Sequence, residues 1–132
     1  MYCGGKTQVT NSRAQKRLNQ VWRRRECLNC RAVFTTEEGI DYGASLVVRP
    51  APHGPVTPFS RDKLFASLLK ALGHRRTAVE DASALTGTVI ARLLQNGTNA
   101  AVSPSEIVKT VILVLEPFDK AACVQYRAYH QG

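Results

Sequence analysis

A Cys-x-x-Cys pair directly behind three arginines constrains this chain more than any other stretch. The arginines at 23–25 are followed by Cys27 and Cys30. Two cysteines separated by two residues can turn both sulfurs onto one tetrahedral ion, and thiolate is a favoured ligand of structural zinc. Cys3, in a glycine-rich segment, is the upstream thiol nearest to the pair. The sequence therefore predicts a zinc site with these three ligands and a fourth that the sequence does not identify.

The positive charge of the chain is concentrated around this pair. The net charge is +8, and residues 1–36 hold eight basic residues and one acidic residue, Glu26, so that this segment accounts for +7. Such a concentration is typical of a module that docks on phosphates, because each neutralised phosphate releases counterions. We favour this interpretation over an ordinary solvated basic face, which stays open as the alternative.

The sequence also indicates a compartment. No segment is long and apolar enough to span a bilayer, and the N-terminus lacks the features of a signal peptide. We therefore expect a cytoplasmic protein without a membrane partner, in which the four cysteines are ligands or core residues rather than disulfides. A thioredoxin-like role for Cys27 and Cys30 would need a helix after the pair, but Phe34–Thr36 has the residues of a strand.

Three short β-prone segments predict a small sheet around the metal. They run over Thr7–Ser12, Val21–Glu26 and Phe34–Thr36, with a basic connector at Arg13–Gln20. Trp22 is the single tryptophan. It can pack beneath the cysteine pair or stack on a base, and we favour packing.

The second part of the chain opens with a predicted hairpin. Glu37–Gly43 is acidic and aperiodic and predicts a linker. Ser45–Arg49 predicts a strand, the proline-filled segment at 50–55 a turn, and Val56–Phe59 a second extended segment. These segments predict a hairpin that covers the helices after it.

Four helices are predicted after the hairpin, mainly from capping residues. Ser60 can cap a first helix that stops at Gly73, and the segment starting at Thr77 has the pattern of a capping box. Ser103, followed by a proline and by a glutamate at the third position, is a stronger start. Pro117 is expected to start the last helix.

The third of these helices is predicted to be the one around which the others pack. Its segment Ile107–Leu115 is apolar on almost every side and rich in β-branched residues, so propensity alone would allow a buried strand, but the capping box favours a helix. An apolar surface all round predicts the central helix of the group. Cys123, in the last helix, is expected in the core rather than at a metal. No metal role is expected for the isolated histidines at 53, 74 and 130.

The helical part lacks the residue patterns of catalysis, so we do not expect an enzyme. It has no nucleophile beside a base, no usefully spaced carboxylate pair and no phosphate loop of the GxxxxGK[ST] type. It does have cations near the start of the first helix: Arg49, Arg61, Lys63 and, two turns on, Lys70. Cations at a helix N-terminus oppose the helix dipole unless an anion sits there. A phosphate site and an ordinary basic surface are equally open interpretations.

Together these motifs are similar to a known family of bacterial regulators. The residues at 23–25, Cys27, Cys30 and Phe34–Thr36 are followed in the second half by Pro58–Lys63. This combination resembles the NrdR family, repressors of ribonucleotide reductase genes, over essentially the whole chain. The resemblance implies an α+β fold, with a small β zinc ribbon over 1–36, a linker over 37–44 and a mainly helical ATP-cone over 45–132 with a covering β-hairpin.

The resemblance also implies ligands and the residues that bind them. A four-cysteine site of the family would hold Zn²⁺, here with Cys3, Cys27 and Cys30. Arginines of the ribbon would contact double-stranded DNA: Arg13, Arg17, Arg23, Arg24, Arg25 and Arg31. Residues of the cone would bind the adenine nucleotides ATP or dATP: Val47, Arg49, Arg61, Lys63, Lys70, Tyr126 and Tyr129.

The function implied is that of a nucleotide-responsive repressor. The cone would sense ATP against dATP and control a homo-oligomer, so that ribbons are presented to promoter DNA in the nucleoid. Two other hypotheses stay open. One is a zinc-ribbon accessory protein that binds nucleic acid without a nucleotide response. The other is a small thiol oxidoreductase that uses Cys27 and Cys30.

Overall fold

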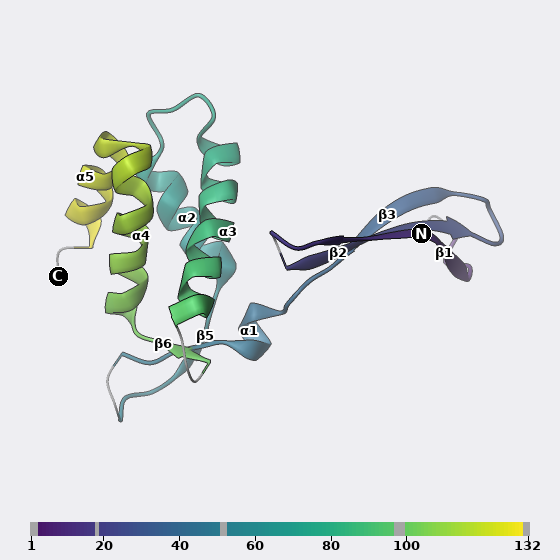
Figure 1. Ribbon diagram of the computed structural model, residues 1–132, viewed down its shortest axis with the longest axis horizontal. Coiled ribbons are helices and arrows are strands. Elements are labelled where there is room, and N and C mark those ends of the chain that lie inside the picture. Colours follow the sequence, from purple (N-terminus) through teal and green to yellow (C-terminus); the bar gives the residue numbers. More distant parts are fainter. Residues whose placement is uncertain (1–2, 18, 51–52, 97–99, 131–132) are drawn as a thin grey trace. The chain divides into compact units, whose positions relative to one another are not determined.

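The chain divides into two compact units, Met1–Asp41 and Tyr42–Gly132 (Figure 1). The structure is a computed structural model that describes residues 3–17, 19–50, 53–96 and 100–130. None of the helices in this described part is both long and apolar enough to cross a membrane.

The first unit is a three-stranded antiparallel sheet in the order β1-β2-β3. Its strands are β1 (Thr7–Gln15), β2 (Gln20–Cys27) and β3 (Val33–Glu38). The three predicted strands are confirmed, but β1 is longer than expected. Arg13, placed by the sequence in a connector, is instead paired with Trp22 in the sheet. The described turn residues are 16, 17 and 19, and Asn19 has a φ of 52° that asparagine tolerates.

Trp22 does not pack beneath the cysteine pair. It is half-buried and lies opposite Arg13 on one side and Glu37 on the other. Cys27 is five residues further along β2, about 16 Å at the usual rise per residue. The expectation of a small tryptophan core under the cysteines is therefore wrong.

The segment expected as a linker is mostly regular structure. Glu37 and Glu38 belong to β3, and α1 (Tyr42–Ser45) forms one helical turn, so only 39–41 remain irregular. The ring of Tyr42 meets the buried ring of Phe59 edge-on, with centroids 6.3 Å apart. This aromatic contact attaches α1 to the second unit.

The second unit contains a small mixed sheet in the order β5-β4-β6. Its strands are β4 (Val47–Val48), β5 (Thr57–Pro58) and β6 (Ala101–Val102), with β5 antiparallel and β6 parallel to β4. The predicted hairpin is confirmed in β4 and β5, although each strand has only two residues. Part of its predicted turn, 51–52, lies outside the described residues. β6 was not predicted, because its two residues carry no periodic pattern.

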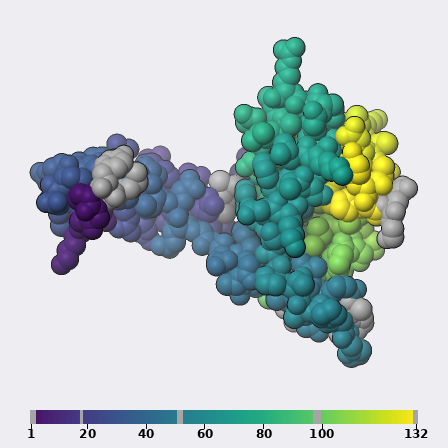
Figure 2. Space-filling model, turned by 180° about the vertical axis from the view of Figure 1, so that it is seen from behind, coloured from purple at the N-terminus to yellow at the C-terminus, as the bar shows by residue number. Residues whose placement is uncertain are grey.

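Four helices form the rest of the second unit. They are α2 (Arg61–Ala71), α3 (Ala78–Asn96), α4 (Pro104–Phe118) and α5 (Lys120–Tyr129). Helices α2 and α4 each pack against both α3 and α5. Figure 2 shows the yellow surface of α5 against the teal surface of the α2 and α3 part. The helices therefore form a closed ring with no central member, and Leu113 on α4 is 61% exposed. The expectation that α4 would be wrapped on all sides is wrong.

Two of the predicted helix starts are confirmed in detail. The Ser60 hydroxyl accepts from the backbone N–H of Lys63 at 3.2 Å. The Ser103 hydroxyl accepts from the Glu106 N–H at 3.2 Å, and the Glu106 carboxylate accepts from the Ser103 N–H at 2.6 Å, which completes the capping box. At the start of α3, by contrast, the Thr77 hydroxyl donates to the carboxylate of Asp81 at 2.7 Å.

The last helix does not start at Pro117, which lies inside α4. The chain turns instead at Asp119, whose carboxylate accepts from the Ala122 N–H at 3.0 Å and caps α5. An aspartate cap satisfies an N–H that would otherwise lack a partner, so it determines the boundary more strongly than the proline does.

The two units differ in how much they bury. Among the described residues, Cys27 is the single fully buried hydrophobic residue of the first unit, and the others form one core cluster in the second. Cys123 belongs to that cluster, as predicted.

Candidate functional site

Three cysteine sulfurs converge at one end of the sheet. Cys27 ends β2 and is buried, while Cys3 and Cys30 are exposed. The three sulfurs lie within 4.8 Å of one another, and those of Cys3 and Cys27 are 3.5 Å apart. Zinc-sulfur bonds of about 2.3 Å in a tetrahedron place sulfurs about 3.8 Å apart. The cluster therefore fits a zinc ion held by these three side chains.

The backbone brings the sulfurs together through a tight turn and a glycine. The Cys27 N–H donates to the Ala32 carbonyl at 2.9 Å, and the Arg31 N–H donates to the Cys27 carbonyl at 3.1 Å. A Cβ on Gly5 would lie 3.2 Å from the Cys3 sulfur and 3.4 Å from the Cys27 sulfur. A larger residue at position 5 would be in tight contact with both sulfurs, so glycine suits their close approach.

Asn29 is a functional candidate that sequence reasoning missed. Its side-chain amide donates to the Cys3 sulfur at 3.5 Å. This bond, with one from the Gly5 backbone, lowers the pKa of Cys3 from 9.0 to about 6. Thiolate is the metal-binding form of cysteine, so the environment of Cys3 favours a ligand. Asn29 lies between the two cysteines of the pair, a position that could have indicated its role. Within the described residues, the cluster holds three ligands, and the fourth is not identified.

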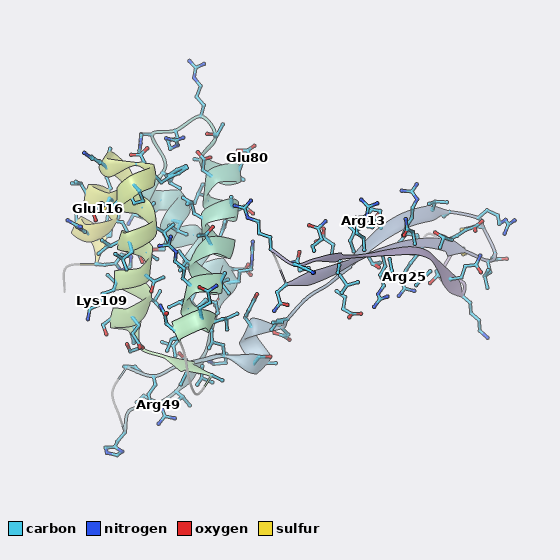
Figure 3. All side chains as sticks on the ribbon, viewed as in Figure 1. Arg13, Arg25, Arg49, Glu80, Lys109 and Glu116 are labelled. Atoms are coloured by element: carbon cyan, nitrogen blue, oxygen red, sulfur yellow. The ribbon has the colours of Figure 1, made fainter. Side chains whose placement is uncertain are left out.

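The arginines of the ribbon lie on both faces of the sheet. Side chains alternate between faces along a strand, and directly paired residues share a face. Arg23 and Arg25 therefore lie on one face of β2, and Arg24 lies on the other. Arg13 pairs with Trp22, which places it on the face of Arg24. Figure 3 labels Arg13 and Arg25, which lie on opposite faces. The six candidate DNA contacts are therefore not one surface.

The remaining two arginines lie at opposite ends of the sheet. Arg17 is in the turn after β1 and is exposed. Arg31 follows the cysteine pair, is 73% exposed, and forms an ion pair of 3.3 Å with Glu26. An exposed pair of this kind contributes little to stability, so Arg31 can exchange its partner for another anion at little cost.

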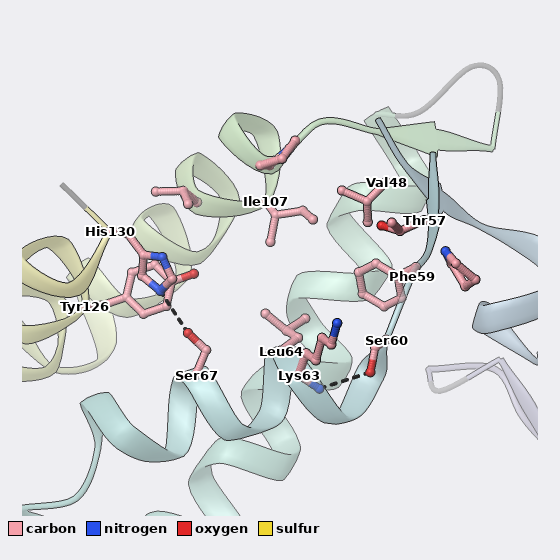
Figure 4. A pocket seen from close by; sticks show the side chains of 13 residues that line it. Val48, Thr57, Phe59, Ser60, Lys63, Leu64, Ser67, Ile107, Tyr126 and His130 are labelled. Carbon is pink, nitrogen blue, oxygen red and sulfur yellow. Dashed lines mark hydrogen bonds between the residues drawn. The ribbon is translucent and has the colours of Figure 1, made fainter. Parts of the chain in front are cut away.

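A cavity of about 270 Å³ lies between the small sheet and three of the helices (Figure 4). Its apolar walls come from all of these elements, and its polar groups lie on α2 and its N-cap, on β5 and at the C-terminal end of α5. The lining includes Val48, Thr57, Pro58, Phe59, Ser60, Lys63, Leu64, Ser67, Pro104, Ile107, Val108, Tyr126 and His130. Apolar walls with a few converging polar groups are typical of small-molecule sites.

His130 forms a wall of this cavity, another residue that the sequence did not single out for binding. Its Nε2 atom is 2.9 Å from the Ser67 hydroxyl, and its ring lies 4.3 Å from the ring of Tyr126. Burial raises the pKa of Tyr126. His130 caps the C-terminus of α5, four residues after Tyr126, a spacing that could have indicated one shared helix face.

A second cavity of about 620 Å³ shares Pro104, Val108 and His130 with the first. It is also lined by Lys109 and Tyr129. His130 therefore belongs to the walls of both cavities.

Comparison with known proteins adds an independent result. The family model described as "Transcriptional repressor NrdR-like, N-terminal domain" matches residues 1–38. Proteins named "Transcriptional repressor NrdR" are similar over almost the whole chain. That of Fervidobacterium nodosum is 32% identical over 98% of this chain and 84% of its own length. That of Dictyoglomus thermophilum is 33% identical over 98% and 85%. That of Methylobacterium sp. is 35% identical over 99% and 69%.

The chain belongs to the NrdR family. This confirms the resemblance inferred from the cysteine and arginine motifs, together with the α+β fold of a small sheet followed by helices. The family model that matches residues 1–38 is named for the zinc ribbon of NrdR, and the matched residues include Cys3, Cys27 and Cys30. Family membership and the convergence of the three sulfurs therefore agree on zinc as the metal.

The residues that the NrdR resemblance assigned to nucleotide binding are only partly brought together. Lys63 and Tyr126 line the first cavity, and Tyr129 lines the second. Val48, rather than its neighbour Val47, lines the cavity. The other three cations lie elsewhere: Arg49 and Arg61 are exposed and absent from both linings, and the Lys70 ammonium lies 3.8 Å from the centre of the Tyr129 ring.

Proposed function

We propose that this chain represses transcription of ribonucleotide reductase genes by binding promoter DNA through its basic zinc ribbon, under the control of adenine nucleotides bound by the helical unit. The observation that carries the proposal is the joining, in one NrdR-family chain, of an arginine-rich sheet with a three-thiol centre to a helical unit with a ligand-sized cavity. Phosphate neutralisation by the arginines would supply most of the DNA affinity and make it fall steeply with salt.

The first cavity has the chemistry that an adenine nucleotide needs. Phe59, Leu64 and Ile107 supply apolar surface for a base. Ser60 and Lys63 lie in the same wall, at the N-terminus of α2. Backbone N–H groups and the helix dipole favour an anion at such an end, and the Lys63 ammonium would add a charge-assisted bond to a phosphate.

Control by ATP against dATP calls for an oligomer. The two nucleotides differ by one hydroxyl, and a net hydrogen bond contributes about 0.5–1.5 kcal/mol, which discriminates only about two- to twelvefold. Moving a population from mostly one assembly to mostly the other takes about 5.5 kcal/mol of differential binding. Several helical units must then act together, so we include nucleotide-dependent oligomerisation in the proposal.

The test is fluorescence anisotropy of the zinc-loaded protein on a ribonucleotide reductase promoter duplex, at one salt concentration, with ATP, with dATP and without nucleotide. The proposal expects an affinity that depends on which nucleotide is present. Tight binding that is indifferent to nucleotide would leave an accessory nucleic-acid-binding protein as the better description. Absence of binding in all three conditions would contradict the repressor function itself.

A matched pair of variants tests the cavity separately. Lys63→Ala should weaken nucleotide binding, measured by calorimetry, by about tenfold or more, because it removes the cation beside the proposed phosphate position. Lys120→Ala removes the same charge from the exposed first residue of α5, outside the cavity lining, and should bind nucleotide as the wild type does. Equal losses in both variants would argue against this cavity as the site.

A further inference from the structure

The arginines on the two faces of the three-stranded sheet differ in how many bonds they make within the sheet. We call these faces the Arg25 face, which carries Arg23 and Arg25, and the Arg24 face, which carries Arg24 and Arg13. All four arginines lie in paired strands of the same small sheet and each contributes one positive charge. The difference between them is the number of bonds that each already makes within the sheet.

On the Arg25 face, both guanidinium groups are engaged. Arg25 donates through Nε to the Thr36 hydroxyl at 3.2 Å and through Nη1 to the Thr7 hydroxyl at 3.3 Å, so one side chain links all three strands. Arg23 donates to the Ser12 hydroxyl at 3.1 Å and pairs with Glu38 at 3.4 Å, and its side chain is only 30% exposed. These bonds link β1 and β3, the two edge strands, to β2.

On the Arg24 face, the cations are exposed. Arg13 and Arg24 make no side-chain hydrogen bond or ion pair with any other part of the chain that the structure describes. Asn11 and Thr35 lie directly opposite Arg24 on the two neighbouring strands. Arg13 is two residues beyond Asn11, a diagonal neighbour of Arg24 at about 7–8 Å. Exposed polar side chains therefore form a row across the sheet, with a second cation beside it.

The row has the chemistry of base recognition. Arginine forms paired bonds to guanine, asparagine forms paired bonds to adenine, and threonine contacts either a polar edge or the thymine methyl group. A second cation at the side of such a row suits a backbone phosphate. Glu37 lies on the same face on β3, opposite Trp22, and Glu26, which shares this face on β2, is engaged by Gln8 and Arg31. Phosphate contact is therefore expected on the β1 side, where Arg13 lies.

We propose that the Arg24 face docks on duplex DNA, with Arg24 and Asn11 against base edges and Arg13 against a phosphate. Arg23 and Arg25 are structural residues that hold the strands of this surface in register. This assignment rests on the proposed function, because it names the surface by which the ribbon would bind DNA. It divides the arginine run at 23–25 into one contact residue between two structural ones.

The test compares single variants that remove the same charge from the same sheet. Arg24→Ala, Arg13→Ala and Arg23→Ala are prepared as full-length, zinc-loaded chains, and their zinc content and melting temperature are measured. Anisotropy then follows binding to a promoter duplex and to a mixed-sequence duplex of equal length, at several salt concentrations. Arg23→Ala is the matched control, because Arg23 is adjacent to Arg24 in β2 and carries the same charge. Its partners, Ser12 and Glu38, are both exposed, so the substitution leaves no buried polar group without a partner.

Each variant has its own expected signature. Arg24→Ala should weaken promoter binding by about 5- to 150-fold and reduce the preference over the mixed-sequence duplex. Arg13→Ala should weaken binding to both duplexes alike and reduce the slope of log affinity against log salt by about 0.9. Arg23→Ala should melt at a lower temperature but bind both duplexes within about twofold of the wild type.

The outcomes separate the two proposals. An affinity loss in Arg23→Ala that equals or exceeds the loss in Arg24→Ala, at wild-type zinc content, overturns the assignment of the Arg24 face and leaves DNA binding intact. A wild-type chain that binds neither duplex overturns both this inference and the proposed function.

Discussion

Cys27 and Cys123 show how position decides the role of a residue type. Both are buried free cysteines, but Cys27 ends a strand beside two other thiols, whereas Cys123 lies among apolar residues of the helical core. The same thiol is a metal ligand where other sulfurs can share the ion and a small hydrophobic residue where they cannot.

This difference gives a prediction about zinc content. Cys27→Ala removes the buried ligand, so the purified variant should hold much less than one zinc per chain, measured by a colorimetric zinc assay. Cys123→Ala is the matched control and should keep the zinc content of the wild type, although the lost packing should lower its stability by about 1 kcal/mol. A full zinc complement in Cys27→Ala would rule out the three-cysteine centre.

Among the elements, the junction of α4 and α5 depends on one carboxylate. Asp119 caps α5, accepts from Arg75 at 2.9 Å and lies 3.1 Å from His74. Arg75 also pairs with Asp81 at 2.7 Å. The loop after α2, the first turns of α3 and the α4–α5 junction are therefore joined through Arg75.

The pKa of Asp119 makes this junction sensitive to acid. The Ala122 N–H, together with Arg75 and His74, lowers that pKa from 3.8 to about 2. A carboxylate with a lowered folded-state pKa contributes stability above its unfolded pKa and loses it as the pH falls toward the folded value. Asp119→Ala should cost about 1–2 kcal/mol of unfolding free energy at pH 7, and the difference from wild type should shrink as the pH falls from about 4 to about 2.

The unfolding free energies are measured by denaturant unfolding, monitored by circular dichroism. Asp119→Asn is the control variant. Asparagine keeps the capping geometry but not the charge, so its cost at pH 7 should be smaller than that of alanine. A pH-independent difference between wild type and Asp119→Ala would show that the charge of Asp119 contributes nothing.

The elements also show how far sequence reasoning reaches. Ser60 and Ser103 were predicted as caps because a cap and its partner are three residues apart. The cysteine centre was predicted for a similar reason, from the close spacing of Cys27 and Cys30. Strand alternation alone separates Arg24 from Arg23 and Arg25, but the face of Arg13 was not predictable, because an irregularity between Val9 and Asn11 shifts the register of β1.

The cavity could be predicted least, because its walls depend on contacts between distant segments. Ser67 and His130 are 63 residues apart in the chain and meet only when α2 packs against α5. Lys70 was expected at the phosphates because it lies on the same helix as Lys63. The packing of α5 instead places the Tyr129 ring beneath the Lys70 ammonium.

At the scale of the whole molecule, the two units differ in the source of their stability. The second unit buries a continuous apolar core of helices. In the described part of the first unit, Cys27 is the one fully buried hydrophobic residue, so apolar burial can contribute little to folding. A metal bound by three thiolates can replace a core of this kind, because its binding free energy becomes folding free energy.

Chelation should therefore unfold one unit and spare the other. With excess EDTA, we expect the helical circular dichroism signal at 222 nm to persist with its wild-type melting transition, because the described core of the second unit holds no cluster of metal-binding side chains. The fluorescence of Trp22 should shift toward that of exposed indole, since the sheet around it loses its metal. DNA binding should disappear in the same titration, and nucleotide binding should remain. Loss of the helical signal together with the tryptophan shift would show instead that the two units fold as one cooperative body.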